Sequence, residues 1–289
     1  MSHSSTAEFM ALFRALESRR PREARLFCDP LAERFLRPSL RGLCRVAQTG
    51  AGETLVGALD RLWPGARASG IARTRWIDDR VLASLQAGAR QLVLLGAGFD
   101  CRAHRLASAV PGPIFEVDRP ATQRRKAQLV GAPVDVGYGP RYVPCDFEND
   151  ALRECLEAAG FDGVTPTVFV LEGVTNYLST DAVDALFADI RTLTPASWIV
   201  FTYVDAAALP AMQSNADGWW LRQTLRAVRE PWTFGIAPEQ LEPFLSERGF
   251  DLLEDVGSAD VRRRYGTDSE PRGYEFYRFA VAATRSVRS

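Results

Sequence analysis

Two glycines and a later aspartate form the most informative chemical pattern in this sequence. Gly96 and Gly98 follow an apolar run that starts at residue 91, and Asp118 ends a second apolar run about 20 residues after the glycines. A Gly-x-Gly corner between a strand and a helix lets a ligand approach the backbone closely, and a carboxylate after the next strand can accept hydrogen bonds from ribose hydroxyls. The spacing therefore predicts a nucleotide cofactor site.

The residues after the glycines indicate which nucleotide fits. A dinucleotide fingerprint would place a third glycine at position 101, where this chain has Cys101. Asp100 stands beside the start of the next helix, and its carboxylate would compete with a diphosphate for the positive end of the helix dipole. S-adenosylmethionine carries ribose and adenine but no phosphate, so we expect it to fit this turn better than NAD.

The composition is that of an ordinary globular protein. The chain has 289 residues, of which 46% are hydrophobic and 25% charged. No linker-like stretch divides it, so we expect a single domain. The net charge of -1 argues against nucleic acid as a partner. The local excesses of arginine at 124–125 and 262–264 are interpreted as solvated faces.

The cysteines and histidines predict no metal site. Five cysteines occur without a Cys-x-x-Cys pair, and the two histidines are His3 and His104, whereas a zinc site needs clustered thiolates or imidazoles. The N-terminus is polar and no apolar run approaches the roughly 20 residues of a membrane span, so neither a signal peptide nor a membrane anchor is expected. These features favour a cytoplasmic protein with reduced thiols.

Apolar periodicity predicts the elements that position these residues. Residues 1–88 are expected to be helical, with one helix starting at Asp29 and Pro30 and a long one over 71–87. From residue 90, short apolar runs alternate with helical segments, as in a parallel sheet covered by helices on both faces. The predicted strands are 91–96, 113–118, 141–146, 166–172 and 197–203, and the predicted helices are 102–109, 119–130, 148–160 and 180–194.

The last third of the chain departs from this alternation. An aromatic-rich helical insertion with Trp219, Trp220 and Trp232 stands where an alternating fold needs only a crossover. A helix over 238–248 and strands over 250–257 and 274–283 are expected to complete the sheet with an antiparallel hairpin. The predicted single domain thus has a helical extension (1–88), a cofactor-binding core (89–204), an acceptor-site insertion (205–237) and a C-terminal part (238–289).

Four motifs, in their order and spacing, resemble the leucine carboxyl methyltransferase family of class I S-adenosylmethionine-dependent methyltransferases. They are ARTRWIDD at 72–79, LLGAGFDCR at 94–102, FEVDRP at 115–120 and VLEGVTNYL at 170–178. The family also includes bacterial O-methyltransferases that act on polyketides and other small molecules. The resemblance implies an α/β, Rossmann-like class I methyltransferase fold with S-adenosyl-L-methionine as cofactor and S-adenosyl-L-homocysteine as product. The chain differs from many members at Cys101 and His104, where Ser and Tyr are common.

The resemblance also implies the roles of individual residues. Arg73 would bind the methionine carboxylate, and Glu172 would lie near the methionine ammonium group. Asp118 would accept hydrogen bonds from the ribose. Tyr177 would lie near the transferring methyl group, so Tyr177 and Arg73 are the predicted catalytic residues. The other predicted cofactor contacts are Gly96, Ala97, Gly98, Asp100, Arg119, Asp146 and Phe147, the last two at the adenine.

Several of these residues also have a purely structural interpretation, and Gly96 and Gly98 could serve only a tight turn. Arg73 could pair with Asp78 or Asp79 on its own helix. Asp118 could cap the helix that follows it, and Asp146 is equally suited to capping the helix predicted from residue 148.

The scarcity of bases favours a carboxylate as the methyl acceptor. Methyl transfer from a sulfonium is an in-line displacement, and a carboxylate is already anionic near neutral pH, whereas a hydroxyl needs a base. His104 lies one turn into the helix after the glycines and is expected to pack there. We therefore predict an O-methyltransferase of secondary metabolism that acts on a small natural product and works as a monomer or homodimer.

Other functions remain open at this point. Within the same fold, the acceptor could be a hydroxyl group or the C-terminal carboxylate of a protein. The chain could also be an NAD-dependent oxidoreductase or a nucleotide-binding protein without catalysis. Its single lysine, Lys126, leaves little for lysine-assisted hydride chemistry.

Overall fold

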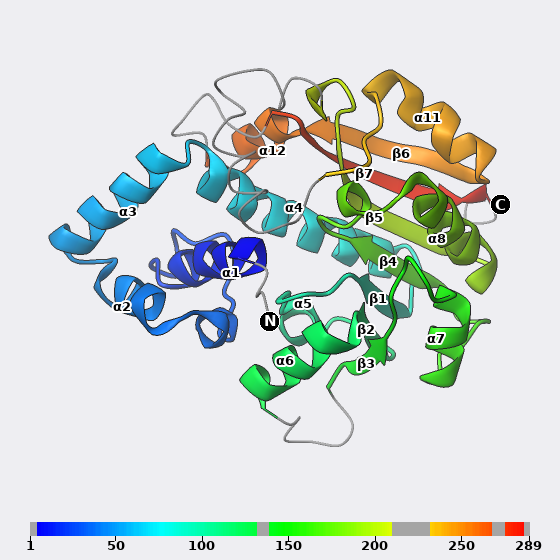
Figure 1. The fold of residues 1–289 in the computed structure, drawn as a ribbon, viewed down its shortest axis with the longest axis horizontal. Helices are drawn as coiled ribbons and strands as arrows, with labels where there is room; N and C mark the ends of the chain where they lie inside the picture. Colours follow the sequence, from blue (N-terminus) through cyan, green and yellow to red (C-terminus); the bar gives the residue numbers. More distant parts are fainter. Residues whose placement is uncertain (1–4, 132–138, 210–231, 268–274, 286–289) are drawn as a thin grey trace.

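A seven-stranded sheet forms the centre of the protein, which we describe from a computed structural model covering residues 5–131, 139–209, 232–267 and 275–285 (Figure 1). The strand order is β3-β2-β1-β4-β5-β7-β6. Strands β1 to β5 pair in parallel, and β7 runs antiparallel to both of its neighbours, β5 and β6. The strands are β1 (Gln91–Leu95), β2 (Ile114–Asp118), β3 (Arg141–Pro144), β4 (Thr167–Leu171), β5 (Ser197–Val204), β6 (Phe250–Gly257) and β7 (Tyr277–Thr284).

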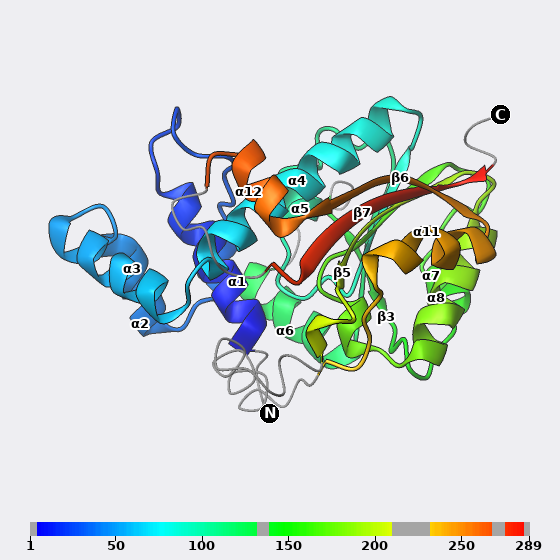
Figure 2. The ribbon, with the colours of Figure 1, turned by 90° about the horizontal axis from the view of Figure 1, so that it is seen from above.

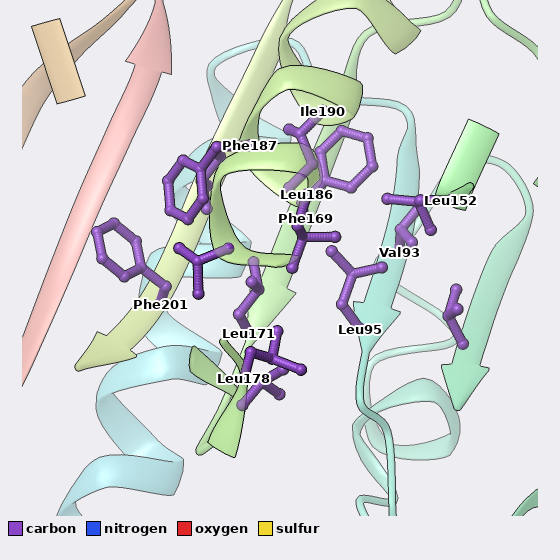
Figure 3. Close-up of a cluster of buried hydrophobic side chains, with 14 of the residues drawn as sticks. Val93, Leu95, Leu152, Phe169, Leu171, Leu178, Leu186, Phe187, Ile190 and Phe201 are labelled. Atoms are coloured by element: carbon purple, nitrogen blue, oxygen red, sulfur yellow. The ribbon is translucent and has the colours of Figure 1, made fainter. Parts of the chain in front are cut away.

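Helices cover both faces of the sheet, which explains why the central strands β1, β4 and β5 are buried along their whole length. One face packs against α7 (Leu152–Ala158), α8 (Thr180–Leu193) and α11 (Pro238–Glu247). Figure 3 shows Phe201 of this face beside Phe187 of α8, and Val93 of this face near Leu152 of α7. The opposite face packs against α4 (Ala66–Gln86), the short α5 (Arg102–Arg105) and α12 (Ser258–Arg264). The predicted α/β fold is thus confirmed.

The N-terminal helices form a separate layer. They are α1 (Ser5–Ser18), the 3-10 helix η1 (Ala32–Phe35), α2 (Pro38–Val46) and α3 (Gly50–Leu62). Both ribbon views place α1 to α3 on the side away from the arrowhead of β7 (Figures 1 and 2). Because β7 is antiparallel to β5, this is the side toward which the parallel strands run. The N-terminal layer therefore lies beside the carboxyl edge of the sheet.

Several predicted helix boundaries are wrong. The helix expected over 102–109 ends at Arg105, and the helix expected from residue 148 starts at Leu152. Helix α6 (Pro120–Val130) agrees with the prediction for 119–130. Asp29 does not begin an α-helix. Its carboxylate pairs with Arg14 and accepts from the Leu31 amide at 3.2 Å, and only the 3-10 helix η1 follows.

The C-terminal strands pair as expected but are not a tight hairpin. Helix α12 lies between β6 and β7 in the chain, and β7 inserts between β5 and β6 in the sheet. Arg262 of α12 is buried and bonds Ser69 and Glu275, so the interpretation of 262–264 as a solvated face is wrong at this residue. Most of the predicted insertion, including Trp219 and Trp220, lies outside the described residues.

Within the described ranges, no helix combines the length and the apolar character that crossing a membrane requires.

Candidate functional site

The predicted cofactor residues meet at one edge of the sheet. Gly96 follows β1, Asp118 ends β2, Asp146 follows β3 and Glu172 follows β4. These four parallel strands are neighbours in the order β3-β2-β1-β4. Their carboxyl ends therefore lie side by side, at the position where open α/β sheets bind ligands.

The glycine corner is shaped by its backbone and by Asp118. Gly96 and Gly98 have φ angles of 65° and 43°, a conformation that glycine adopts at little cost. The Gly98 amide donates to Asp118 Oδ2 at 2.6 Å, and the Arg119 amide donates to Asp118 Oδ1 at 2.7 Å. The Ala97 amide donates to the Val117 carbonyl at 3.0 Å. Asp118 thus ties the glycine corner to the end of β2.

The environment of Asp118 affects both its charge and its role. Burial raises the pKa of this carboxyl, and the hydrogen bonds from the Gly98 and Arg119 amides act against that rise. Helix α6 has Arg119 as its N-cap residue, with no side-chain cap, so the alternative that Asp118 caps this helix is wrong.

Arg73 and Glu172, which are 99 positions apart in the sequence, form an ion pair in this site. Arg73 Nε lies 2.8 Å from Glu172 Oε1, and Arg102 Nη2 lies 3.0 Å from Glu172 Oε2. Although burial acts in the opposite direction, the two arginines hold the pKa of Glu172 below its ordinary value. The residues predicted to bind the two charged groups of methionine therefore lie together.

Arg73 does not pair with the aspartates of its own helix. Asp78 binds Arg102 and Arg105 instead, and Asp79 binds Arg75. The structural alternative for Arg73 is therefore wrong.

Asp100 bonds within the glycine loop. Its Oδ1 accepts from the Arg102 amide at 2.8 Å, and its carboxylate also pairs with the Arg102 guanidinium. Although burial would raise it, the nearby arginines, Arg102 first, lower the pKa of Asp100 to about 2. Its carbonyl accepts a hydrogen bond from Lys126.

Asp146 shapes the turn after β3. Its carboxylate accepts from the Glu148 amide at 3.3 Å and from the Asn149 side chain at 3.2 Å, and Arg119 Nε lies 3.4 Å from it. It does not cap α7, whose N-cap is Ala151. Phe147 is half-buried against the core.

Tyr177 lies at the end of the 3-10 helix η2 (Thr175–Tyr177), in an aromatic group with Tyr277 and with Trp232 of the predicted acceptor-site insertion. The Tyr177 and Trp232 rings are 6.5 Å apart, and Trp232 also contacts Tyr277 with centroids 5.5 Å apart. The Arg73 guanidinium lies 5.6 Å from the centre of the Tyr277 ring. The two predicted catalytic residues are therefore connected through Trp232 and Tyr277.

A network of buried charges surrounds this site and had no signal in the sequence. Arg14 of α1 binds Asp29 at 2.9 Å and donates to the Phe99 carbonyl at 2.5 Å. Arg105 of α5 lies 3.4 Å from Asp29 as well. Because the partners are up to 85 positions apart, no local pattern could have indicated them.

His104 lies in α5 and is half-buried. Its Nε2 is buried and has no hydrogen-bond partner among the described residues. Burial, followed by the charge of Lys126, lowers its pKa below the ordinary value. These features agree with the expectation that His104 packs within the fold.

Two cysteines come together although their spacing did not indicate it. The ligand atoms of Cys145, Asp150 and Cys155 all lie within 4.8 Å of one another. Asp150 accepts a hydrogen bond from the Asp146 amide at 2.8 Å, and burial together with the neighbouring Cys155 raises the pKa of Cys145.

Comparison with known proteins identifies relatives along most of the chain. The profile of the family described as leucine carboxyl methyltransferase matches residues 7–191. A protein of Parafrankia sp. (strain EAN1pec), provisionally named as an S-adenosyl-L-methionine-dependent methyltransferase, is 38% identical over 192 residues, which cover 65% of this chain and 58% of that protein. A protein of Mycobacterium sp. (strain KMS) with the same provisional name is 35% identical over 290 residues, covering 95% of this chain and 91% of its own.

A solved structure supports the fold. The crystal structure of a protein from Thermobifida fusca, provisionally described as a methyltransferase, superposes with a TM-score of 0.56 and covers 93% of this chain and 97% of its own. Its sequence is 20% identical, so this likeness concerns the fold alone. The matched part of this chain spans less than two thirds of the Parafrankia protein.

Proposed function

This chain belongs to the leucine carboxyl methyltransferase family of S-adenosyl-L-methionine-dependent methyltransferases, and from that membership we propose that it methylates a carboxylate oxygen of a small, partly apolar acceptor. The ion pair between Arg73 and Glu172, next to the glycine corner and the Tyr177 aromatic group, carries the proposal. It presents one positive and one negative side chain where the amino-acid end of the cofactor would bind.

The residues present fit S-adenosyl-L-methionine. A Cβ placed on Gly98 would meet only the Gly96 carbonyl oxygen among the described atoms, at 3.8 Å, so the corner is open to a ligand on that side. Arg73 would hold the methionine carboxylate, Glu172 the ammonium group and Asp118 the ribose hydroxyls. Asp146 and Phe147 would contact the adenine. When bound, the cofactor supplies an electrophilic methyl group on a sulfonium.

The aromatic side chains would orient the acceptor and exclude water from it. Tyr277 lies next to Arg73, Trp232 contacts Tyr277, and Tyr177 contacts Trp232. These rings offer flat apolar surfaces. Removing water from a carboxylate makes it a better nucleophile, and fixing it in line with the methyl group lowers the entropic part of the barrier.

The distribution of basic residues supports a carboxylate acceptor. Lys126 is paired with Glu116 and bonds the Asp100 carbonyl, and His104 lies in α5 with a lowered pKa. The described hydrogen bonds and ion pairs of Lys126 and His104 do not involve Tyr177, so neither side chain is placed to act as a base there. A carboxylate needs no base, whereas a hydroxyl would. We further propose a cytoplasmic enzyme of secondary metabolism, a monomer or homodimer, that binds neither nucleic acid nor membrane.

Binding and product analysis test this proposal. In calorimetry we expect S-adenosylhomocysteine to bind and NAD not to bind. Asp118→Ala should weaken S-adenosylhomocysteine binding roughly 10- to 100-fold, because charged hydrogen bonds are lost. The labelled product made with a tritiated methyl donor should lose its label in mild base, as an ester does. A base-stable ether would reject the carboxylate, and preference for NAD would reject the enzyme class.

A further inference from the structure

Asn176 is fully buried, yet its side chain has no hydrogen-bond partner in the part of the chain that the structure describes. Its relative exposure is 0%, and Nδ2 and Oδ1 are both without a described partner. Buried side-chain amides are almost always bonded, because an unpaired buried donor or acceptor costs free energy. A residue that departs from this rule beside a proposed active site points to a ligand that completes its bonds.

Hydrogen bonds on both sides of Asn176 fix the backbone from which its side chain extends. The Gly173 amide donates to Thr202 Oγ1 at 2.8 Å, and Thr175 Oγ1 donates to the Thr202 carbonyl at 3.1 Å. The Asn176 carbonyl accepts from the Thr233 amide at 2.8 Å. These bonds attach the turn that carries Asn176 to β5 on one side and to the 232–233 segment on the other.

A second unpaired donor lies in the adjoining segment. Trp232 precedes Thr233, and its indole Nε1 is buried without a hydrogen-bond partner among the residues described. The Trp232 ring contacts Tyr177 and Tyr277, and the Arg73 guanidinium lies over the Tyr277 ring. Both unpaired groups therefore belong to segments that contact the proposed acceptor site.

We propose that the Asn176 amide and the Trp232 indole N–H recognise the methyl acceptor as a carboxylate with a neighbouring hydrogen-bond donor. This inference rests on the proposed function and assigns its substrate class. Asn176 Nδ2 and Trp232 Nε1 donate to the carboxylate oxygens, and Asn176 Oδ1 accepts from a hydroxyl or amide N–H next to the carboxylate. Such an arrangement satisfies all three buried polar atoms at once.

The neutrality of these donors suits the chemistry. An arginine or lysine bound to the acceptor carboxylate would stabilise its negative charge and weaken it as a nucleophile. Neutral N–H groups orient the carboxylate with less loss of nucleophilicity. The described cations near the site, Arg73 and Arg102, are already paired with Glu172. The carboxylate can thus be held while it keeps its reactivity.

Matched pairs of simple acids test this assignment. Calorimetry with the protein saturated with S-adenosylhomocysteine would compare salicylate with benzoate, and mandelate with phenylacetate. Each pair differs by the hydroxyl next to the carboxylate. We expect the hydroxy acid to bind roughly 10-fold more tightly, since a site with a buried unpaired acceptor discriminates against a ligand without the donor.

Two variants separate the contributions of the two residues. Asn176→Leu should abolish the preference for the hydroxy acid, and it should fold because it replaces unpaired polar atoms with apolar ones of similar size. Trp232→Phe keeps an aromatic ring and should weaken both acids of a pair while retaining the preference. Trp76→Phe is the matched control, because the Trp76 indole is also buried without a described partner but belongs to α4 and packs in the core against the sheet. This variant should leave the binding of all four acids unchanged.

Specific results would overturn the assignment. Equal binding within each pair by the wild type, binding of none of the four acids, or an unchanged preference in Asn176→Leu would each do so. Titration with S-adenosylhomocysteine alone separates the acceptor assignment from the proposed function. If it binds without discrimination between the acids, only the acceptor assignment fails; if it does not bind, the proposed function fails as well.

Discussion

Gly96 and Gly98 share a left-handed backbone but differ in what surrounds them. A Cβ on Gly96 would lie 2.5 Å from Val174 Cγ2, whereas the nearest described atom to a Cβ on Gly98 is 3.8 Å away. Valine is branched at Cβ and has few rotamers with which to move aside. Packing as well as conformation therefore requires glycine at position 96, whereas conformation alone requires it at position 98.

This difference predicts unequal effects of substitution. Gly98→Ala should lower the free energy of unfolding by about 1–2 kcal/mol, the cost of a left-handed alanine. Gly96→Ala should lose a further 1–3 kcal/mol, roughly the cost of overpacking. Urea denaturation of the two variants measures the difference. Equal decreases in the free energy of unfolding would show that the Val174 side chain can move aside without an energetic cost.

Asn176 and Arg262 show why single residues can mislead a reader of the sequence. Asn176 occurs in the VLEGVTNYL motif, but its burial, and the lack of a described hydrogen-bond partner for its amide, are visible only when the turn, β5 and the 232–233 segment are placed together. Arg262 lies in a run of three arginines that suggests a solvated surface, yet it is 1% exposed and bonds both Ser69, which is 193 positions away, and Glu275.

At the scale of elements, a buried ion pair fastens α6 to β2. Lys126 Nζ lies 2.6 Å from Glu116 Oε2, and both side chains are almost fully buried. Lys126 also donates to the Asp100 carbonyl, so the same side chain connects α6 with the glycine loop. Burial raises the pKa of Glu116 to about 7, and Lys126 acts against this rise.

Removing one partner of this pair should cost more than removing both. Glu116→Gln leaves the Lys126 ammonium buried without a counter-charge, so the free energy of unfolding should fall by about 3–5 kcal/mol. Replacing both residues, Glu116→Leu with Lys126→Met, should restore most of this loss, because apolar side chains of similar volume can fill the space. Chemical denaturation of the two proteins makes the comparison; a double variant less stable than the single one would contradict it.

Helix α5 illustrates how tertiary contacts override local pattern. Its sequence predicts a helix to residue 109, but the helix ends at Arg105. Arg102 and Arg105 direct their guanidinium groups to Asp78, and Arg102 also binds Asp100. We interpret the short helix as the geometry that lets both arginines reach these carboxylates.

At the scale of the whole molecule, the network of buried charges attaches the N-terminal layer to the glycine loop at Phe99 and Asp100. Arg14 of α1 bonds the Phe99 carbonyl and Asp29, and Arg105 connects Asp29 with Asp78 of α4. The same network reaches Glu172 through Arg102. Breaking it in one place therefore affects the attachment of several elements.

Asp100 gives this network a dependence on pH. Its pKa in the folded protein is about 2, below the ordinary value of 3.8, so the unfolded chain binds its proton first as the pH falls. The stability from Asp100 is fully present above about pH 4 and is lost between about pH 4 and 2, by about 2 kcal/mol. Asp100→Asn should flatten the fall in melting temperature over this range; an unchanged slope would show that other carboxylates dominate.

The sequence by itself determined the alternation of strands and helices, the glycine corner and the acidic residues that end the strands. These signals are local: apolar periodicity, glycine and helix-capping residues act within a few positions, as the cap from Ser179 to the Ala182 amide at the start of α8 shows. Parallel strands then bring their carboxyl ends to one edge, so the sequence pattern suffices to place Asp118, Asp146 and Glu172 together.

The tertiary structure alone decided which partners these residues have. The Arg73–Glu172 pair, the Arg14–Asp29 pair, the insertion of β7 between β5 and β6, and the burial of the Asn176 amide all depend on segments far apart in the chain. Such pairings follow from how whole faces pack and from which charges must be neutralised once water is excluded. No window of neighbouring residues contains that information.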